Sequence, residues 1–199
     1  MFEAQEIVFL HQTHSSIVCH VDQFPNQSNQ LSRFSRFVGD ALVTQTSNRL
    51  LCVRTADCVP ILIAHKTRPI VAAVHVGWKG IVLEKILENT AQVLKGLDAL
   101  SHYCVVMGPC LHQNSFQAGS IIHNNVAHKK YFKAAHYFDF PLFVYDRLCF
   151  LGFEDIERIE VDTYTHPEFF SFRRGMHQGM RQGRQASVIM LKDMPLKIG

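Results

Sequence analysis

The stretch LLCVRTADCVPILIAHKTRPIVAAVHV, residues 50–76, decides the fold class of this chain. It contains three short apolar runs rich in Val and Ile, at Leu50–Val53, Val59–Ala64 and Ile70–Val76. Runs of this length and composition, separated by turn-forming residues, are typical of buried β-strands. Several strands therefore precede the first helix, which favours a mixed α/β or α+β sandwich over a doubly wound dinucleotide-binding fold.

Beyond residue 76 the spacing of apolar residues changes from that of a strand to that of a helix. Val82, Ile86, Val93 and Leu97 fall on one helical face, which predicts an amphipathic helix of about four turns over residues 82–97. The polar PNQSNQLS segment, residues 25–32, is typical of an exposed loop. Further strands are expected at residues 7–21, interrupted by QTHSS, and at 41–44, 103–107 and 186–191, and further helices at 114–133 and 146–153.

Length and composition indicate one domain spanning residues 1–199. Of the 199 residues, 47% are hydrophobic and 19% are charged, which is ordinary for a globular domain with a substantial core. The net charge is +3 without a dense basic run, so nucleic-acid binding is not indicated. The N-terminal MFEAQEIVFL resembles neither a signal peptide nor a membrane anchor, so a cytoplasmic protein is expected. The six cysteines form no CxxC pair and are expected to be mainly buried thiols.

Three segments each place one zinc-binding type of residue beside a predicted strand. They are His14 in QTHSS, Cys58 in TADCVP and His75 in VHVGW. Imidazole and thiolate bind zinc well, and three protein ligands leave a fourth position for water or substrate. The gaps of 44 residues (58 − 14) and 17 residues (75 − 58) are unlike those of a zinc finger, so the fold must bring the three together. Each residue taken alone also fits an ordinary core Cys or His, or, for His14, a surface loop.

Charged residues near these segments form a second group of candidates. Asp57 precedes Cys58, and a carboxylate beside a buried strand needs a partner. Lys79 follows Trp78, where it is placed to contact an anion at a helix N-terminus. The sequence contains neither GxGxxG nor GxxxxGK[ST], so these phosphate-binding fingerprints are absent.

Arginines cluster in the stretch RRGMHQGMRQGRQAS, which begins at residue 173. A glycine-containing loop with several arginines can clamp an anion such as phosphate, but a solvated basic loop has the same composition. The arginines of this stretch are Arg173, Arg174, Arg181 and Arg184.

Six segments, in order from residue 12 to residue 191, resemble one family. They are QTHSSIV, GDALVT, TADCVPILI, AAVHVGWKG, GPCLHQNSFQAG and FFSFRR…GRQASVIML, and the pairing of TADCVP with HVGWKG is the most specific part. The family is that of the YfiH-like, laccase-domain proteins, also called multicopper polyphenol oxidases and, more recently, purine nucleoside phosphorylases. The resemblance implies an α/β sandwich related to the Cys-His hydrolase fold of cytotoxic necrotizing factor. It also implies a zinc ion held by His14, Cys58 and His75.

The activities that the resemblance implies are phosphorolysis of adenosine, inosine, guanosine and methylthioadenosine, and deamination of adenosine. Purine nucleosides and phosphate are then the expected partners. On this hypothesis Arg54 and Arg174 position phosphate, and Asp57 accepts a proton or orients a ligand. Lys79 is a further candidate for contact with an anion.

Three other readings remain open. The first is a copper-dependent polyphenol oxidase, since copper binds most such sites more tightly than zinc, although the chain has no HxH pair. The second is a metal-free hydrolase with Cys58 as nucleophile and His75 as base. The third is a partner-binding domain without enzymatic activity.

The chain also departs from the pattern of the family that it resembles. Family members begin with a longer region rich in glycine and asparagine, which this chain is expected to lack. Ser15 stands where glycine is usual, His112 replaces another glycine, Phe116 replaces a tyrosine, and Asp162 replaces a frequent cysteine. The segment at residues 175–182 is also longer than usual. These changes leave the metal-binding set intact and bear on the choice of substrate.

Overall fold

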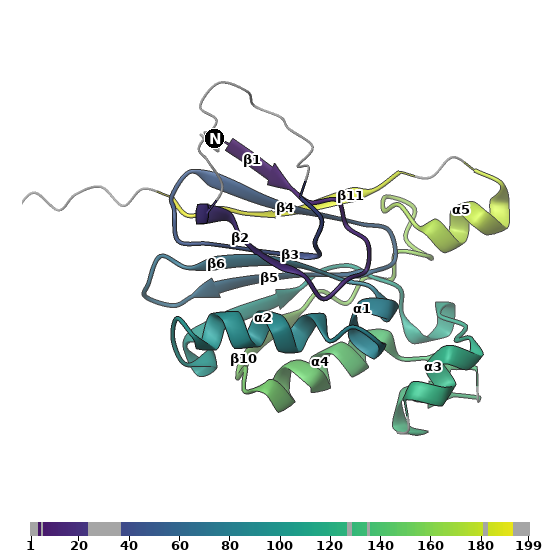
Figure 1. Ribbon diagram of the computed structural model, residues 1–199. Coiled ribbons are helices and arrows are strands. Elements are labelled where there is room, and N and C mark those ends of the chain that lie inside the picture. Colours follow the sequence, from purple (N-terminus) through teal and green to yellow (C-terminus); the bar gives the residue numbers. More distant parts are fainter. Residues whose placement is uncertain are drawn as a thin grey trace, which may run out of the picture.

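The computed structural model describes residues 4, 6–23, 37–126, 129–134, 136–180 and 183–192. These residues form three layers: a small sheet, a large sheet beneath it and a layer of helices (Figure 1). The predicted loop at residues 25–32 and Arg181 lie outside the described residues. Within the described ranges, every helix is too short or too polar to span a lipid bilayer.

The large sheet has six strands in the order β10-β7-β5-β6-β3-β2. Its centre is the antiparallel pair of β5 and β6, which is the part of the chain that the opening stretch predicts. All six residues of β6 are buried, because the small sheet covers one face of the large sheet and helices cover the other. The strands are β2 (Val18–His20), β3 (Ala41–Thr44), β5 (Val59–His65), β6 (Val71–Val76), β7 (Tyr103–Met107) and β10 (Asp155–Arg158).

The small sheet has three strands in the order β1-β4-β11, with β1 parallel and β11 antiparallel to β4. Leu51 and Val53 of β4 pack in one buried cluster with Leu42, Val71 and Ala73 of the large sheet. Apolar side chains on the facing sides of two sheets thus form the first core. The strands are β1 (Glu6–Phe9), β4 (Arg49–Thr55) and β11 (Gln185–Ile189).

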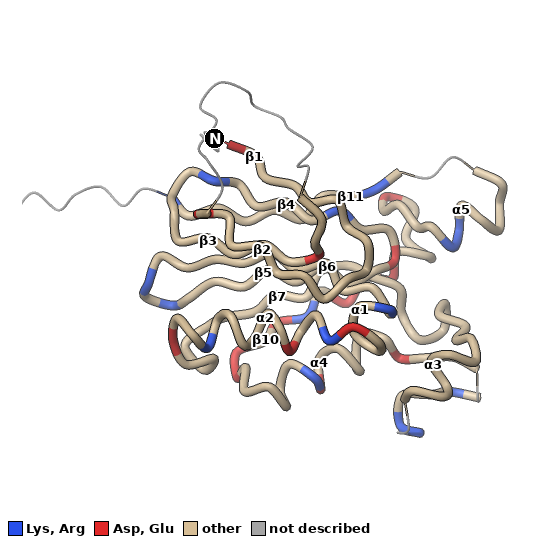
Figure 2. Tube along the Cα trace, in the orientation of Figure 1, with Lys and Arg blue, Asp and Glu red and all other residues tan. Residues whose placement is uncertain are grey.

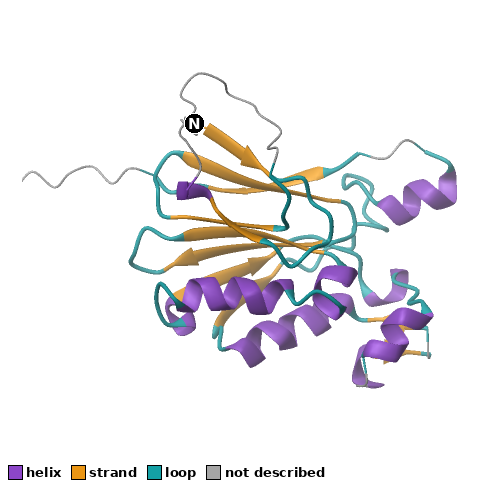
Figure 3. Cartoon of the chain, viewed as in Figure 1, coloured by secondary structure: helices purple, strands orange, loops and turns teal. Residues whose placement is uncertain are grey.

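The helical layer covers the other face of the large sheet (Figure 3). The second and larger core lies there, where Ile61, Ile63 and Val74 of the sheet belong to one buried cluster with Leu94 and Val144 of two helices. The remaining elements are α1 (Trp78–Val82), α2 (Ile86–Lys95), α3 (Ser120–Asn125), α4 (Phe140–Leu151) and α5 (Phe172–Gln178), the hairpin β8 (Phe132–Lys133) and β9 (Tyr137–Phe138), and 3-10 turns at Val21–Gln23, Leu100–His102, Gln113–Ser115 and Lys129–Tyr131.

The mixed α/β class is confirmed, and the strands expected at residues 41–44 and 103–107 have those bounds. The expected strand at residues 7–21 is two strands, β1 and β2, in different sheets. Figure 2 shows that the charged residues of the described part are scattered along the trace, with both signs interspersed.

The predicted helices differ from the observed ones in extent. The helix expected at residues 82–97 corresponds to α2, which begins only at Ile86, because Lys85 has a left-handed φ of 58° and separates α2 from α1. The long helix expected at residues 114–133 is wrong: α3 is short, and the Ala118 N–H donates to the His136 carbonyl at 2.7 Å rather than within a helix.

Two further segments differ from expectation, one in where its helix begins and the other in being partly helical. The helix expected at residues 146–153 begins at Phe140, because the Asp139 side chain accepts the Leu142 N–H at 3.0 Å and Pro141 suits the first turn. The first part of the arginine stretch, expected as a loop, is helical as far as Gln178 in α5, where the Ser171 hydroxyl accepts the Arg174 N–H at 3.1 Å.

Candidate metal centre and cleft

The segments that hold His14, Cys58 and His75 meet at one end of the two sheets. His14 lies in the connection from β1 to β2, and Cys58 lies in the turn from β4 to β5. Both segments therefore cross from the small sheet to the large one. His75 lies near the end of β6. One ligand atom from each of the three side chains lies within 4.8 Å of the others, and Cys58 Sγ is 3.6 Å from His14 Nε2.

Asp40, directly before β3, joins the two histidine segments. Its fully buried carboxylate accepts the His75 Nδ1 hydrogen at 2.6 Å. It also accepts the backbone N–H groups of Thr13, His14 and Ser15 at 3.2, 3.1 and 2.7 Å, and the Ser15 hydroxyl at 2.7 Å. Sequence reasoning missed Asp40, although an ionisable residue at the start of an apolar strand is a signal that a partner is required.

The electrostatics of this group favour the ionised forms of Asp40 and Cys58. Burial acts against the charged form of Asp40, but hydrogen bonds from His75 and Ser15 outweigh it and lower the pKa of Asp40 to about 2. Burial also opposes the Cys58 thiolate, but His14 and His75 lower the pKa of Cys58 to about 6. Asp40 and Cys58 raise the pKa of His75 to about 9 against the effect of burial. Cys58 is therefore a thiolate at neutral pH, and a bound metal replaces the second proton of His75.

The chemistry of these donors fits zinc. Two imidazoles and a thiolate are zinc ligands, and a carboxylate bonded to the far nitrogen of a ligand histidine is the usual support in such sites. The His14 ring also lies directly against Gly77, where a Cβ would be 2.0 Å from His14 Cδ2. The absence of a side chain at this position is therefore what lets His14 reach the other two residues.

The three residues open into a cleft of about 700 Å³. Aromatic side chains and three arginines supply much of its lining, so the cleft combines flat apolar surfaces with cationic groups. The aromatic residues are Trp78, Phe116, Phe140 and Phe172, the arginines are Arg54, Arg173 and Arg184, and the rest of the lining is Gln12, Thr55, Ala56, Asp57 and Leu111.

Asp57 and Arg54 line the cleft together with the metal-binding set. The Asp57 carboxylate is engaged by the chain itself, since it accepts the Thr163 hydroxyl at 2.8 Å and the Arg173 N–H at 2.7 Å. Arg54 is held at its backbone, where the N–H donates to Gln12 Oε1 at 2.9 Å.

Arg174 and Lys79 are not among the described residues that line the cleft. Lys79 Nζ lies 5.6 Å from the centre of the Trp78 ring. The Arg174 guanidinium is used inside the protein, where it donates to backbone carbonyls and holds one segment together; its acceptors are Thr163, Tyr164 and His166, at 2.8, 2.8 and 3.1 Å, and Phe169. Two other arginines of the same stretch, Arg173 and Arg184, line the cleft instead.

Three of the residues that depart from the family pattern make contacts near the candidate site or in the segments beside it. Ser15 adds its hydroxyl to the donors around Asp40. Phe116 lines the cleft, with the Arg173 guanidinium carbon 5.4 Å from its ring centre. Asp162 accepts the Ser115 hydroxyl at 2.5 Å. Two of these residues therefore touch the candidate site or its support.

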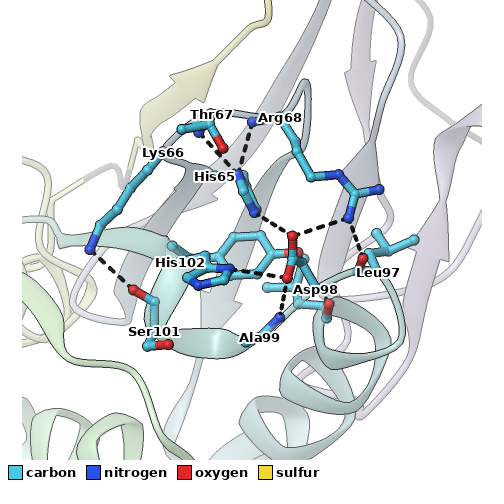
Figure 4. Close-up of polar contacts among 11 residues, drawn as sticks. His65, Lys66, Thr67, Arg68, Leu97, Asp98, Ala99, Ser101 and His102 are labelled. Atoms are coloured by element: carbon cyan, nitrogen blue, oxygen red, sulfur yellow. Dashed lines mark hydrogen bonds and ion pairs between the residues drawn. The ribbon is translucent and has the colours of Figure 1, made fainter.

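A second group with metal-binding side chains, His65, Asp98 and His102, lies at the opposite end of β5 (Figure 4). His65 Nδ1 accepts the N–H groups of Thr67 and Arg68 at 3.1 and 2.9 Å, so its ring hydrogen is on Nε2, which donates to Asp98 at 3.1 Å. The Arg68 guanidinium is 3.2 Å from the same carboxylate. A histidine with both nitrogens hydrogen-bonded is a poor metal ligand, and so is a carboxylate paired with an arginine. We therefore interpret this group as a hydrogen-bond network that stabilises the fold.

Asp98→Asn is expected to lower the thermal unfolding midpoint at pH 7 by about 2–6 °C. The pKa of Asp98 lies well below its usual range. The largest cause is the hydrogen bond from the Ala99 N–H, followed by those from Arg68 and the two imidazoles. Because the folded-state pKa is lowered, the stabilisation is complete above the unfolded-state pKa of about 4 and is lost as the pH falls below it. Calorimetry from pH 7 to pH 3 is expected to show the difference between wild type and variant shrinking at low pH.

The control for Asp98 is Asp155→Asn, which removes an exposed ion pair with Lys66 at 3.3 Å in the same region. It is expected to change the midpoint by less than about 2 °C. If the difference in unfolding midpoint between wild type and Asp98→Asn is the same at every pH, the ionised Asp98 carboxylate is not the source of the stabilisation.

Known proteins are similar to this chain over most of its length. The family described as multi-copper polyphenol oxidoreductase laccase matches residues 1–192. A Rickettsia conorii protein named purine nucleoside phosphorylase is 32% identical over 187 residues, which cover 88% of this chain and 74% of that protein. A protein of an unknown prokaryotic organism, named adenosine deaminase, is 30% identical over 139 residues, 68% of this chain and 50% of that protein.

Solved structures show the same fold. The crystal structure of a Bacillus licheniformis protein described as hypothetical protein YfiH superposes with a TM-score of 0.79 at 24% identity, covering 94% of this chain and 74% of that one. YlmD from Geobacillus stearothermophilus gives a TM-score of 0.77 at 20% identity. With the match over residues 1–192 and this shared fold, the chain belongs to the YfiH-like family of laccase-domain proteins.

Proposed function

We propose that this chain is a zinc-dependent enzyme of purine nucleosides, acting by phosphorolysis and by deamination of adenosine. The observation that carries the proposal is the convergence of His14, Cys58 and His75 on one cleft lined by aromatic rings and arginines. The names of the relatives, purine nucleoside phosphorylase and adenosine deaminase, support this substrate class. Zinc bound by the three residues would supply a Lewis acid beside the substrate.

The aromatic residues of the cleft suit a purine ring. Phe116 and Phe140 are buried, which fixes their faces, and Phe172 is about half exposed at the rim. Flat rings of this kind bind a heterocycle by offset stacking or edge contacts. Trp78, which follows Gly77 at the start of α1, adds a further aromatic surface near His14.

The arginines of the cleft suit phosphate. Phosphorolysis forms a bond between a phosphate oxygen and the anomeric carbon of the ribose, and the purine leaves with the electron pair of the broken C–N bond and takes up a proton. Arg54, Arg173 and Arg184 can hold phosphate for this attack, in place of the predicted Arg174, whose guanidinium is bound to carbonyls. Asp57 orients Arg173 by accepting its backbone N–H.

The test is elemental analysis of protein purified without added metal, followed by assays with adenosine and inosine with and without phosphate. The expected result is about one zinc per chain, phosphate-dependent release of the free base from both nucleosides, and release of ammonia from adenosine. Chelation is expected to remove both activities, and zinc to restore them. Protein that binds no zinc, or that is active only with copper on phenols, overturns the proposal.

One observation also fits a metal-free thiol hydrolase. Cys58 Sγ lies 3.6 Å from His14 Nε2, and the pKa of Cys58 is lowered to about 6, as a nucleophilic thiolate requires. Treatment with an alkylating reagent in excess chelator separates the two functions. A hydrolase of this kind stays active in the chelator and is inactivated by the reagent, whereas the zinc enzyme is already inactive in the chelator.

Arg173→Ala is expected to raise the KM for phosphate about tenfold, because it removes a cation that faces the cleft. Steady-state kinetics with phosphate varied at saturating inosine measure the effect. Arg174→Ala is the comparison, since loss of its bonds to carbonyls is expected to lower the unfolding midpoint instead. An unchanged KM for phosphate in Arg173→Ala contradicts the assignment.

A further inference from the structure

We infer that Asp40 is the positioning residue that assembles the zinc-binding set, an inference that rests on the proposed function. Asp40 touches neither the cleft nor a substrate, and it acts through the two histidines. Its carboxylate is bonded on one side to the His75 ring and on the other to the backbone around His14. One side chain thus holds together two ligands that come from different parts of the chain.

The backbone at His14 shows why this support is needed. His14 has a φ of 61°, in the left-handed region that non-glycine residues rarely adopt. The N–H groups of Thr13, His14 and Ser15 all point to the Asp40 carboxylate. Three successive donors on one anion offset the cost of the unfavourable backbone conformation and place the His14 ring over Gly77.

The orientation of His75 depends on the same carboxylate. An ionised carboxylate only accepts hydrogen bonds, so His75 Nδ1 carries the hydrogen of the 2.6 Å bond. The Nε2 atom of His75 is thereby left to face Cys58 and His14. A second bond, from the His75 N–H to the Asp40 carbonyl at 2.7 Å, fixes the strand itself. Asp40 therefore sets both the position and the tautomer of this ligand.

Ser15 contributes two donors to this support. Its hydroxyl and its N–H each lie 2.7 Å from Asp40 Oδ2. Ser15 thus adds a bond that tightens the His14 segment onto Asp40.

The test is the dissociation constant for zinc, measured by competition with a chromophoric chelator at pH 7. Asp40→Asn is expected to weaken zinc binding about 10–100-fold, because an amide cannot accept all of these donors. Ser15→Ala, which removes one hydroxyl, is expected to weaken it about fivefold. Cobalt(II) in place of zinc gives a second readout, since its visible spectrum reports the geometry of the ligands, and the spectrum of Asp40→Asn is expected to change.

Asp22→Asn is the matched control. Asp22 accepts the Thr44 and Thr46 hydroxyls at 2.5 and 2.8 Å and the Gln45 N–H at 2.8 Å, so it supports the opposite end of β3 in a similar way. Its loss is expected to lower the unfolding midpoint without changing the zinc affinity or the cobalt spectrum. A loss of zinc affinity in Asp22→Asn as large as that in Asp40→Asn overturns the inference, because support of β3 alone then explains it.

The remaining outcomes show whether this inference alone, or the proposed function as well, is wrong. If the wild type binds zinc and folded Asp40→Asn binds it equally well, the inference is wrong and the proposed function stands. If Asp40→Asn does not fold, Ser15→Ala decides, and equal affinity in that variant overturns the inference. A wild type that binds neither zinc nor cobalt overturns both.

Discussion

Gly77→Ala is expected to weaken zinc binding about 100-fold and to reduce nucleoside turnover at limiting zinc, while the fold stays intact. An alanine Cβ would lie 2.0 Å from His14 Cδ2 and 2.7 Å from His14 Nε2. Gly77 has φ −87° and ψ 157°, which alanine adopts without strain, so the clash with the histidine ring is the only obstacle. The ring must move away from Cys58, and chelator competition measures the loss.

Gly119→Ala provides a control of the same kind. Gly119 also precedes the first turn of a helix, α3, with φ −86° and ψ 172°, and a Cβ there would meet no atom within 4 Å. This variant is expected to keep the zinc affinity and turnover of the wild type. Unchanged zinc binding in Gly77→Ala would show that the His14 ring is not a ligand in this position.

Cys58→Ala is expected to abolish stoichiometric zinc and to lower both nucleoside activities at least about 1000-fold. The thiolate is the only anionic member of the set, and its loss leaves two imidazoles that hold zinc weakly. Elemental analysis and turnover assays on the same preparation measure the two effects together.

Cys149→Ala is the control for Cys58, because Cys149 is an exposed thiol on α4. It is expected to retain zinc and activity. Full activity and full metal content in Cys58→Ala would exclude both the zinc site and the thiol hydrolase, since each requires this sulfur.

The central strands of both sheets could be predicted because they are short apolar runs bounded by turn residues. The runs at residues 50–53, 59–64 and 70–76 correspond to β4, β5 and β6. Helix ends were harder to predict, because they depend on single backbone conformations. Because Lys85 is left-handed, α2 begins at Ile86 rather than at Val82, where the amphipathic pattern starts, and a hydropathy pattern does not report such a conformation.

The residue types of the candidate site could be predicted, but their partners could not. His14, Cys58 and His75 follow from ligand chemistry and from the family resemblance, and the fold brings their ligand atoms together. Two adjacent arginines illustrate the limit. Arg173 lines the cleft and donates to one carbonyl, that of Gln117, whereas Arg174 donates to four carbonyls and does not line the cleft, and only tertiary contacts distinguish them. The role of Asp40 likewise depends on contacts between residues far apart in the sequence, namely with Thr13 to Ser15 and with His75.

The two crossings between the sheets have a consequence for thermodynamic linkage. His14 and Cys58 lie where the chain passes from the small sheet to the large one, and His75 lies in the large sheet. A metal shared by the three ties the layers together and binds only while they are docked, so it shifts the equilibrium toward the folded chain. At a free zinc concentration 1000 times the dissociation constant this shift is about 4.1 kcal/mol, which raises the unfolding midpoint of a chain of this size by about 8–16 °C. If the proposed function holds, the supply of zinc sets the stability of the folded protein as well as its chemistry.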